Sequence, residues 1–229
     1  MQGRVVLVTG ADGGLGKFVT QAFLDAGATV IGTSTKIQQS AFSSDRFTAM
    51  AARISSLESA RILVNQVTTQ FARLDVLAHT IGGFAGGTSV ADTDDVTFQK
   101  MMDVNLNSFF HMLRATLPAL RHARSGRIIA IGSRAALEPG SAVGAYSASK
   151  AAMVSLIRTV AAENKDAGVR ANVILPGTMD TPANREAMPK ADFSKWVRPS
   201  SVASLMVWLA SDAGIDVNGA VLPVYGTEG

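Results

Sequence analysis

Short apolar runs alternate with longer segments of helical period along almost the whole chain. Repeated alternation of this kind is typical of a parallel sheet covered by helices on both faces. Short right-handed connections then favour a doubly wound α/β fold with seven parallel strands. The expected strands cover residues 5–9, 29–33, 47–50, 76–80, 127–131, 169–175 and 220–224. The expected helices cover residues 15–26, 57–72, 101–123, 147–167 and 200–210.

The chain is predicted to form one domain over residues 1–229. Its 229 residues, 47% of them hydrophobic, are enough for a single large core. No internal repeat or low-complexity linker divides it. Only residues 177–198 form a long segment without clear elements, and such a segment is typical of a lid or a substrate loop.

The composition excludes several classes of protein. The chain has no cysteine, which removes disulfides, thiolate nucleophiles and cysteine metal sites, and no metal is expected. No run of eighteen apolar residues is present, so no membrane partner is expected. The net charge is only +3 and the basic residues are scattered, which argues against a nucleic-acid partner. A strand expected almost from the first residue leaves no room for a signal peptide, so the cytoplasm is the expected location.

A glycine-rich turn joins the first expected strand to the first expected helix. Residues 9–16 read Thr-Gly-Ala-Asp-Gly-Gly-Leu-Gly. Glycine lets the backbone approach a pyrophosphate, and a helix N-terminus offers free N–H groups and a positive dipole end. A glycine-rich sequence by itself is weak evidence for a dinucleotide site. Its position between the first strand and the first helix makes the evidence much stronger. Its expected cofactor-binding residues are Gly10, Asp12, Gly14, Leu15 and Gly16.

Tyr146 and Lys150 are four residues apart where the expected helix of residues 147–167 begins, and Ser133 lies thirteen residues before Tyr146. Residues at this spacing share a helix face, so the phenol and the ammonium can point into one site. A nearby positive charge lowers the pKa of a phenol and suits it to proton transfer. The pair by itself is equally compatible with a tyrosine at a helix start followed by a solvated lysine.

Together these motifs resemble the short-chain dehydrogenase/reductase family over essentially the whole chain. The resemblance implies a Rossmann domain that binds NAD(P), with a catalytic set of Asn105, Ser133, Tyr146 and Lys150. The Pro-Gly-x-x-x-Thr motif of residues 176–181 matches the family segment that receives the nicotinamide end of the cofactor. The resemblance assigns these further residues to the cofactor: Gly82, Tyr146, Lys150, Pro176, Gly177, Thr178 and Thr181.

Two loops are most similar to the dihydropteridine reductase branch of this family. They are the Gly-Gly-Phe-Ala-Gly-Gly loop of residues 82–87 and the Met-Pro-Lys-Ala-Asp-Phe-Ser-Lys-Trp segment of residues 188–196. The likeness implies a flat, pterin-like substrate with an aromatic wall from the glycine loop. The expected substrate residues are Phe84, Met179, Met188, Phe193 and Trp196. Phe84 has the alternative role of a core anchor for a loop that is poor in side chains.

The chain also departs from that branch, which ordinarily lacks the serine found here at position 133. The second expected strand ends near Ser34, where an NAD-binding relative would carry an aspartate for the ribose hydroxyls. Without that carboxylate a ribose 2′-phosphate is not repelled. NADP(H) is therefore favoured over NAD(H), with Ser34, Thr35 and Lys36 as cofactor residues. Arg53 replaces an acid that often contacts adenine, and His79 replaces a family asparagine as a structural substitute.

The predicted function is an NAD(P)H-dependent oxidoreductase in which Tyr146 gives the proton. A quinonoid dihydropteridine-like ring is one expected substrate, and a ketone or 3-oxoacyl thioester is the alternative. A regulator that senses NADPH without turnover is a distant alternative, because it would not need Tyr146 and Lys150. The resemblance also implies a homodimer or homotetramer that pairs through helices 101–123 and 147–167.

Overall fold

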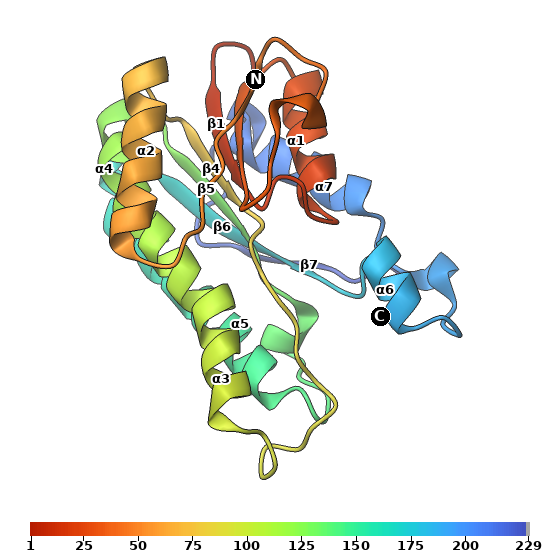
Figure 1. Cartoon of the computed structure of the whole chain (residues 1–229). Helices are drawn as coiled ribbons and strands as arrows, with labels where there is room; N and C mark the ends of the chain where they lie inside the picture. The colour runs from red at the N-terminus through yellow and green to blue at the C-terminus, as the bar shows by residue number, and fades with distance from the viewer. Residues whose placement is uncertain (228–229) are drawn as a thin grey trace.

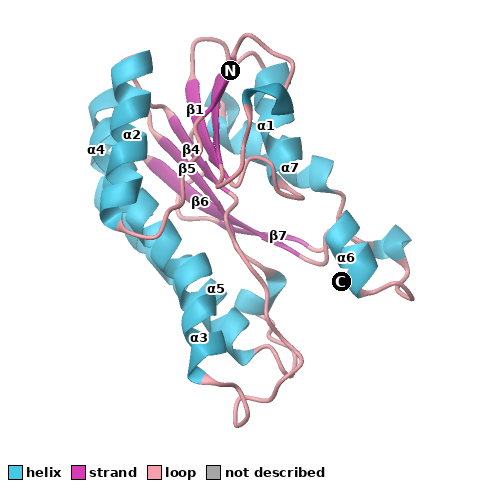
Figure 2. Ribbon diagram, viewed as in Figure 1, coloured by secondary structure: helices cyan, strands magenta, loops and turns pink. Residues whose placement is uncertain are grey.

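Seven parallel strands form one twisted sheet in the computed structural model, which describes residues 1–227 (Figures 1 and 2). The strand order is β3-β2-β1-β4-β5-β6-β7, so the chain starts at the sheet centre and winds first to one edge and then to the other. This confirms the doubly wound fold expected from the strand–helix alternation. The strands are β1 (Val5–Thr9), β2 (Thr29–Thr33), β3 (Phe47–Ala49), β4 (Val76–His79), β5 (Arg127–Ile131), β6 (Arg170–Pro176) and β7 (Val221–Val224).

Helices cover both faces of the sheet (Figure 1). One apolar cluster joins the sheet to α2, α4 and α5, and a second joins its other face to α1 and α7. The strands are therefore buried on both sides, which explains their continuous apolar sequences. Within residues 1–227 no helix is long and apolar enough to cross a membrane. The helices are α1 (Gly16–Asp25), α2 (Leu57–Phe71), α3 (Asp95–Met101), α4 (Ser108–Ala123), α5 (Gly144–Asn164), α6 (Pro182–Ala187) and α7 (Pro199–Ala210).

Two expected segments differ in kind from the structure, whereas the ends of the other expected elements differ by at most three residues. The helix expected over 101–123 begins earlier, because the Asp94 side chain accepts a hydrogen bond from the Thr97 amide and caps α3. A π-helical segment, Met102–Asn107, then joins α3 to α4. The segment 177–198, expected to be irregular, contains α6, which Thr181 caps. Both helices start at side-chain caps, a signal that apolar periodicity does not detect.

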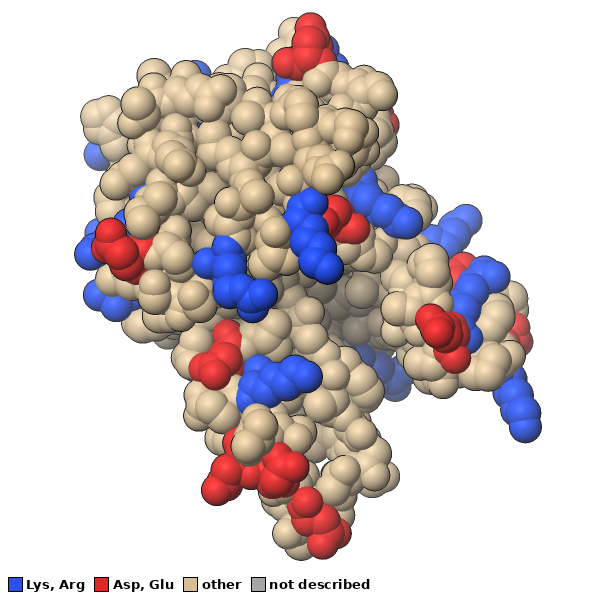
Figure 3. Space-filling view, in the orientation of Figure 1, with Lys and Arg blue, Asp and Glu red and all other residues tan. Residues whose placement is uncertain are grey.

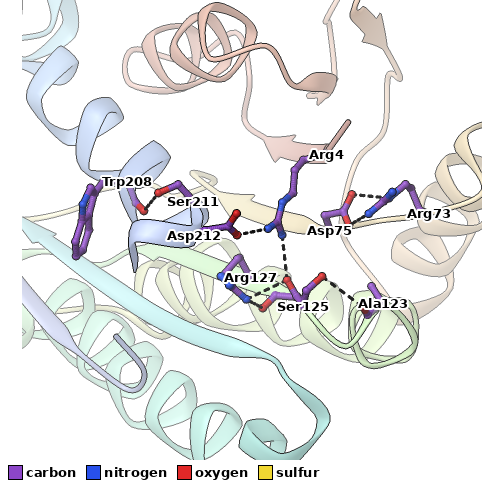
Figure 4. A network of polar contacts seen from close by, with 10 residues as sticks. Arg4, Arg73, Asp75, Ala123, Ser125, Arg127, Trp208, Ser211 and Asp212 are labelled. Carbon is purple, nitrogen blue, oxygen red and sulfur yellow. Dashed lines mark hydrogen bonds and ion pairs between the residues drawn. The ribbon is translucent and has the colours of Figure 1, made fainter. Parts of the chain in front are cut away.

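Polar contacts join the strands at the amino edge of the sheet (Figure 4). Asp75 is fully buried and accepts hydrogen bonds from the Val5 amide and the Arg73 guanidinium. Arg4 pairs with Asp212, which follows α7. Arg127 is buried and donates to the backbone carbonyls that precede β5. These contacts fix the edge opposite the carboxyl ends of the strands, where a doubly wound sheet carries its ligand site.

Candidate active site

A cleft of about 1200 Å³ lies at the carboxyl ends of the strands. Its walls come from the segments that follow β1, β2, β3, β4, β5 and β6. The space-filling view shows this hollow beside the lobe that contains α6, with basic side chains around it (Figure 3). Neighbouring strands β1 and β4 lead in opposite directions across the sheet, and a crevice opens where their connections diverge.

The glycine-rich turn after β1 forms the floor of the cleft. Gly10 has a φ of +71°, a backbone conformation that favours glycine. A Cβ at Gly16 would lie 1.9 Å from the Gly10 carbonyl oxygen, so the turn closes only with glycine at this position. The N-terminus of α1 has no side-chain cap, and the Lys17 and Phe18 amides already donate to the Gly13 and Leu15 carbonyls. A ligand would therefore accept from the amides just before them, at the very start of the helix. These features fit a pyrophosphate group bound at the helix start.

Ser133, Tyr146 and Lys150 all line the same cleft. Ser133 follows β5, whereas Tyr146 and Lys150 lie in the first two turns of α5. The Lys150 ammonium is buried and donates a hydrogen bond over 2.9 Å to the carbonyl of Ile131, the last residue of β5. Burial lowers the pKa of Lys150 to about 8, because few polar groups replace the water around its charge.

The pKa of Tyr146 differs from the sequence-based expectation. Burial raises this pKa above its ordinary value, and a hydrogen bond with the Ser133 hydroxyl offsets only part of the shift. We had expected Lys150 to lower it. The ammonium is instead hydrogen-bonded to Ile131, and desolvation dominates the environment of the phenol. Tyr146 is therefore a neutral phenol in this form of the site, ready to donate a proton.

Asn105 is buried beside the cleft, in the π-helical segment. Its side chain accepts from the Gly83 amide at 2.9 Å and donates to the Gly83 carbonyl at 3.1 Å and to Ser149 at 3.0 Å. A Cβ at Gly82 would lie 3.1 Å from the Lys150 Nζ and 3.2 Å from the Asn105 Oδ1. Asn105 thus connects the glycine loop after β4 to helix α5, directly beside Lys150.

His79 at the end of β4 lies in the core below this network. Its Nδ1 shares a hydrogen bond of 2.9 Å with the Thr9 hydroxyl, and its ring packs against Phe109. Its Nε2 has no hydrogen-bond partner among residues 1–227. Burial, with a smaller contribution from the Lys150 charge, lowers the pKa of His79 to about 3. The imidazole is therefore neutral and joins β1 to β4 in the way expected of a structural residue.

The residues expected to bind substrate divide into two groups. Phe84, Met179 and Met188 line the cleft. The Phe84 side chain is 68% exposed, and its ring meets that of Tyr146 edge-on, with centroids 5.0 Å apart. Phe193 and Trp196 are outside the cleft lining: their rings pack together at 4.7 Å, and Trp196 is only 6% exposed. Phe193 also contacts α6, because the Arg185 guanidinium lies over its ring at 4.7 Å.

The residues expected to bind cofactor line the cleft with one exception. Lys36 is exposed but does not reach the lining, whereas Ser34, Thr35 and Arg53 do. The Ser34 hydroxyl donates to the Asp12 carboxylate over 2.7 Å. The remaining expected residues in the lining are Gly10, Asp12, Gly14, Leu15, Gly16, Gly82, Tyr146, Lys150, Pro176, Gly177, Thr178 and Thr181.

Several lining residues were absent from the sequence-based set. Asp103, Asn107 and His111 recur every four residues on one face of the helical segment that contains Asn105. That spacing could have indicated that the three residues share one helix face with the site. Arg134 and Glu138 form an ion pair at the mouth, and Arg134 also stacks over Tyr225 at 4.7 Å. The contact with Tyr225 joins distant parts of the chain and has no sequence signal.

Comparison with known proteins identifies relatives over the full length. The family described as "short chain dehydrogenase" matches residues 4–192. A 3-oxoacyl-[acyl-carrier-protein] reductase of rhamnolipid biosynthesis from Pseudomonas aeruginosa is 32% identical, with 99% of this chain and 96% of that protein covered.

Two solved structures share the fold. One, ElxO with NADP bound, has a TM-score of 0.92 at 24% identity and covers 99% of this chain and 98% of its own. The other is a 3-ketoacyl-(acyl-carrier-protein) reductase from Brucella melitensis in complex with NADH. It has a TM-score of 0.87 at 23% identity and covers 98% of both chains.

Proposed function

Because this chain belongs to the short-chain dehydrogenase family of oxidoreductases, we propose that it is an NAD(P)H-dependent reductase in which Tyr146 donates the proton. One observation carries the proposal. Ser133, Tyr146 and Lys150 line a cleft whose floor is a glycine turn and an uncapped helix N-terminus. A non-catalytic sensor of the cofactor would need the glycine turn but not the three polar side chains.

The glycine turn and the segment after β6 would hold the two ends of the cofactor. Backbone amides of Gly14, Leu15 and Gly16 would bind the pyrophosphate, and residues 176–181 would contact the nicotinamide end. When bound, the cofactor supplies the hydride. The fit is supported by the close approach at Gly14, where a Cβ would lie 3.2 Å from the Thr181 Cγ2. A side chain there would fill the space between the two segments.

The side chains of the cleft then control the proton. Tyr146 donates its phenol proton to the substrate oxygen or ring nitrogen as negative charge develops there. The Ser133 hydroxyl donates a hydrogen bond to the same atom. Lys150 donates to the Ile131 carbonyl and would also be available to the nicotinamide ribose of a bound cofactor. Its charge would favour the phenolate left by proton transfer. Asn105 keeps the glycine loop in place beside Lys150.

We propose a flat ring of the dihydropteridine type as the first substrate class. The exposed Phe84 ring beside Tyr146 supports it, since a planar substrate can stack on an aromatic face within reach of the phenol. Met179 and Met188 would form the opposing apolar wall. The segment of residues 177–198 carries both methionines and would close over the substrate and exclude water, with its two ends held together by the Met179–Val197 bridge.

A 3-oxoacyl thioester or simple ketone is the second substrate class. Ser133 favours it, because the dihydropteridine reductase branch ordinarily lacks that serine. The 32% identical relative is named as a 3-oxoacyl reductase. An assay of NADPH oxidation separates the two classes, because each predicts turnover with its own substrate and little with the other.

NADP(H) is the proposed cofactor, in preference to NAD(H). The uncharged Ser34 at the end of β2 and the Arg53 guanidinium in the cleft lining support this preference. Lys36 is at most a peripheral contributor, since it stays outside the lining.

We also propose a homo-oligomer that pairs through α4 and α5. Exposed Phe110 and Leu137 near those helices support it, and light scattering after size exclusion would contradict it by giving a 24 kDa monomer.

The test of function compares two substrates and two variants. Purified protein with NADPH is given quinonoid dihydropterin or a 3-oxoacyl thioester, and oxidation of the cofactor is followed by absorbance. Tyr146→Phe is expected to lose at least about 1000-fold in kcat, in line with a lost proton donor and its oriented hydroxyl, while its Kd for NADPH stays within about twofold. Tyr225→Phe is the matched control, because this half-buried phenol lies outside the cleft lining. Full activity of Tyr146→Phe would remove the proposed proton donor.

A further inference from the structure

A carboxylate lies at the end of β2 although the sequence has no acid there. Asp12 belongs to the glycine turn after β1. Its carboxylate accepts a hydrogen bond from the Ser34 hydroxyl, with an oxygen–oxygen distance of 2.7 Å. The Ser34 oxygen in turn accepts from the Lys36 amide at 3.2 Å. Asp12 and Ser34 both line the cleft. The tertiary fold thus brings a negative charge from another segment to the position that the strand itself leaves neutral.

The charge lies where the two forms of the cofactor differ. In a doubly wound fold the adenosine ribose lies against the end of the second strand, and the two cofactors differ by a 2′-hydroxyl or a 2′-phosphate on that ribose. A carboxylate accepts a hydrogen bond from a hydroxyl but repels a phosphate. Arg53 also lines the cleft, and the amide of its neighbour Ala52 donates to the Ser34 carbonyl at 3.0 Å. The positive charge of Arg53 has the opposite preference. No ion pair joins Arg53 to Asp12 in the described part of the chain, so the two charges act separately on a ligand.

We propose that Asp12 is a specificity-determining residue of the cofactor site, which favours the 2′-hydroxyl of NADH and limits the preference for NADPH. The inference rests on the proposed function, since it assumes that a nicotinamide cofactor binds in this cleft. Asp12 acts through its charge, and Ser34 holds that charge in place. The protein therefore binds both cofactors. Arg53 raises the affinity for NADPH, and Asp12 lowers it.

The test measures equilibrium binding and needs no substrate. Dissociation constants for NADH and NADPH are obtained from the fluorescence of the reduced nicotinamide, for the wild type and for Asp12→Asn. The variant is expected to raise the ratio of NADPH to NADH affinity about tenfold, the range of one repulsive charge pair near a surface. The gain in NADPH affinity should shrink as salt is added, because the repulsion of the 2′-phosphate is screened.

Two further variants separate charge from other effects. Asp25→Asn makes the same change at the far end of α1, at an exposed carboxylate, and should leave the ratio unchanged. Ser34→Ala keeps the carboxylate and should alter the ratio less than about threefold. An unchanged ratio in Asp12→Asn, or a full tenfold shift in Ser34→Ala, would overturn the inference. Failure of the wild type to bind either cofactor is a different result, which contradicts the proposed function itself.

Discussion

The ammonium of Lys150 donates to the backbone carbonyl of Ile131 over 2.9 Å, at the point where β5 ends and the cleft begins. Lys150 is buried with a pKa of about 8, so it carries its charge below that pH and loses it above. A charged Lys150 attracts an anionic cofactor, whereas a neutral one does not. We therefore expect the Kd for NADH to be constant up to about pH 8. Above that pH the Kd should rise, by at most tenfold per pH unit, as the affinity weakens.

NADH is the right probe for this prediction, because it lacks a 2′-phosphate that would itself titrate. Lys150→Met should bind NADH more weakly and without this pH dependence. Lys165→Met removes an exposed lysine beyond the end of α5 and should retain the wild-type profile. A flat wild-type profile between pH 6.5 and 9.5 would show that the Lys150 charge does not contribute to binding.

Phe84 is expected to act on substrate rather than on stability. Its ring is mostly exposed, so Phe84→Ala should lower the free energy of unfolding by less than about 1 kcal/mol. The same variant should raise KM for a ring substrate at least tenfold, since one stacked aromatic face contributes on the order of 1–3 kcal/mol. Phe84→Tyr retains the face and serves as the control. Loss of about 3 kcal/mol of stability in Phe84→Ala would instead favour the core-anchor alternative.

Gly16→Ala is expected to disrupt the cofactor cradle. The added Cβ would overlap the Gly10 carbonyl oxygen, so the turn must shift, at a cost of about 1–3 kcal/mol of stability. NADPH affinity should fall by at least about tenfold, because the amides that bind the pyrophosphate move with the turn. Thermal unfolding and the Kd for NADPH measure the two effects. Gly140→Ala, at a lining glycine with open space around its Cβ position, should change neither.

His79 should make the folded state sensitive to acid. Its pKa is about 3 in the fold and 6.5 in the unfolded chain, so the unfolded chain binds an extra proton between these values. Stability from this residue is fully present above pH 6.5 and is lost as pH falls towards 3, at up to about 1.4 kcal/mol per pH unit.

Denaturant unfolding at several pH values measures this slope. His79→Asn retains a polar partner for Thr9 and cannot be protonated, so its unfolding free energy should depend less on pH over the same range. His122→Asn removes an exposed histidine near the end of α4 and should keep the wild-type slope. Equal slopes in the His79 variant and the wild type would contradict the buried, neutral state.

Local patterns predicted the sheet and most of its helices. Mostly apolar, β-branched runs of five residues gave β1, β2 and β5 with the bounds that the structure has, because a strand covered on both faces buries most of its side chains. The short helices α3 and α6 were missed, since they start at side-chain caps, and the π-helical geometry of residues 102–107 inside the expected helix was not predicted. The glycine turn was predictable because its constraints are local: only glycine permits its φ and its close approach to α1.

The fold class, the glycine cradle and the four-residue spacing of Tyr146 and Lys150 could be read from the sequence, whereas Ser133 was assigned through the family resemblance. Spacing along one helix or one turn fixes such groups, because their geometry is local. The protonation state of Tyr146 depends on the tertiary structure, because burial raises its pKa and a hydrogen bond with Ser133 offsets only part of that shift. Only the tertiary structure placed the Asp12 carboxylate beside Ser34, because the two residues lie on different strand ends. Charge and burial depend on contacts between distant segments, and no pattern along the chain records them.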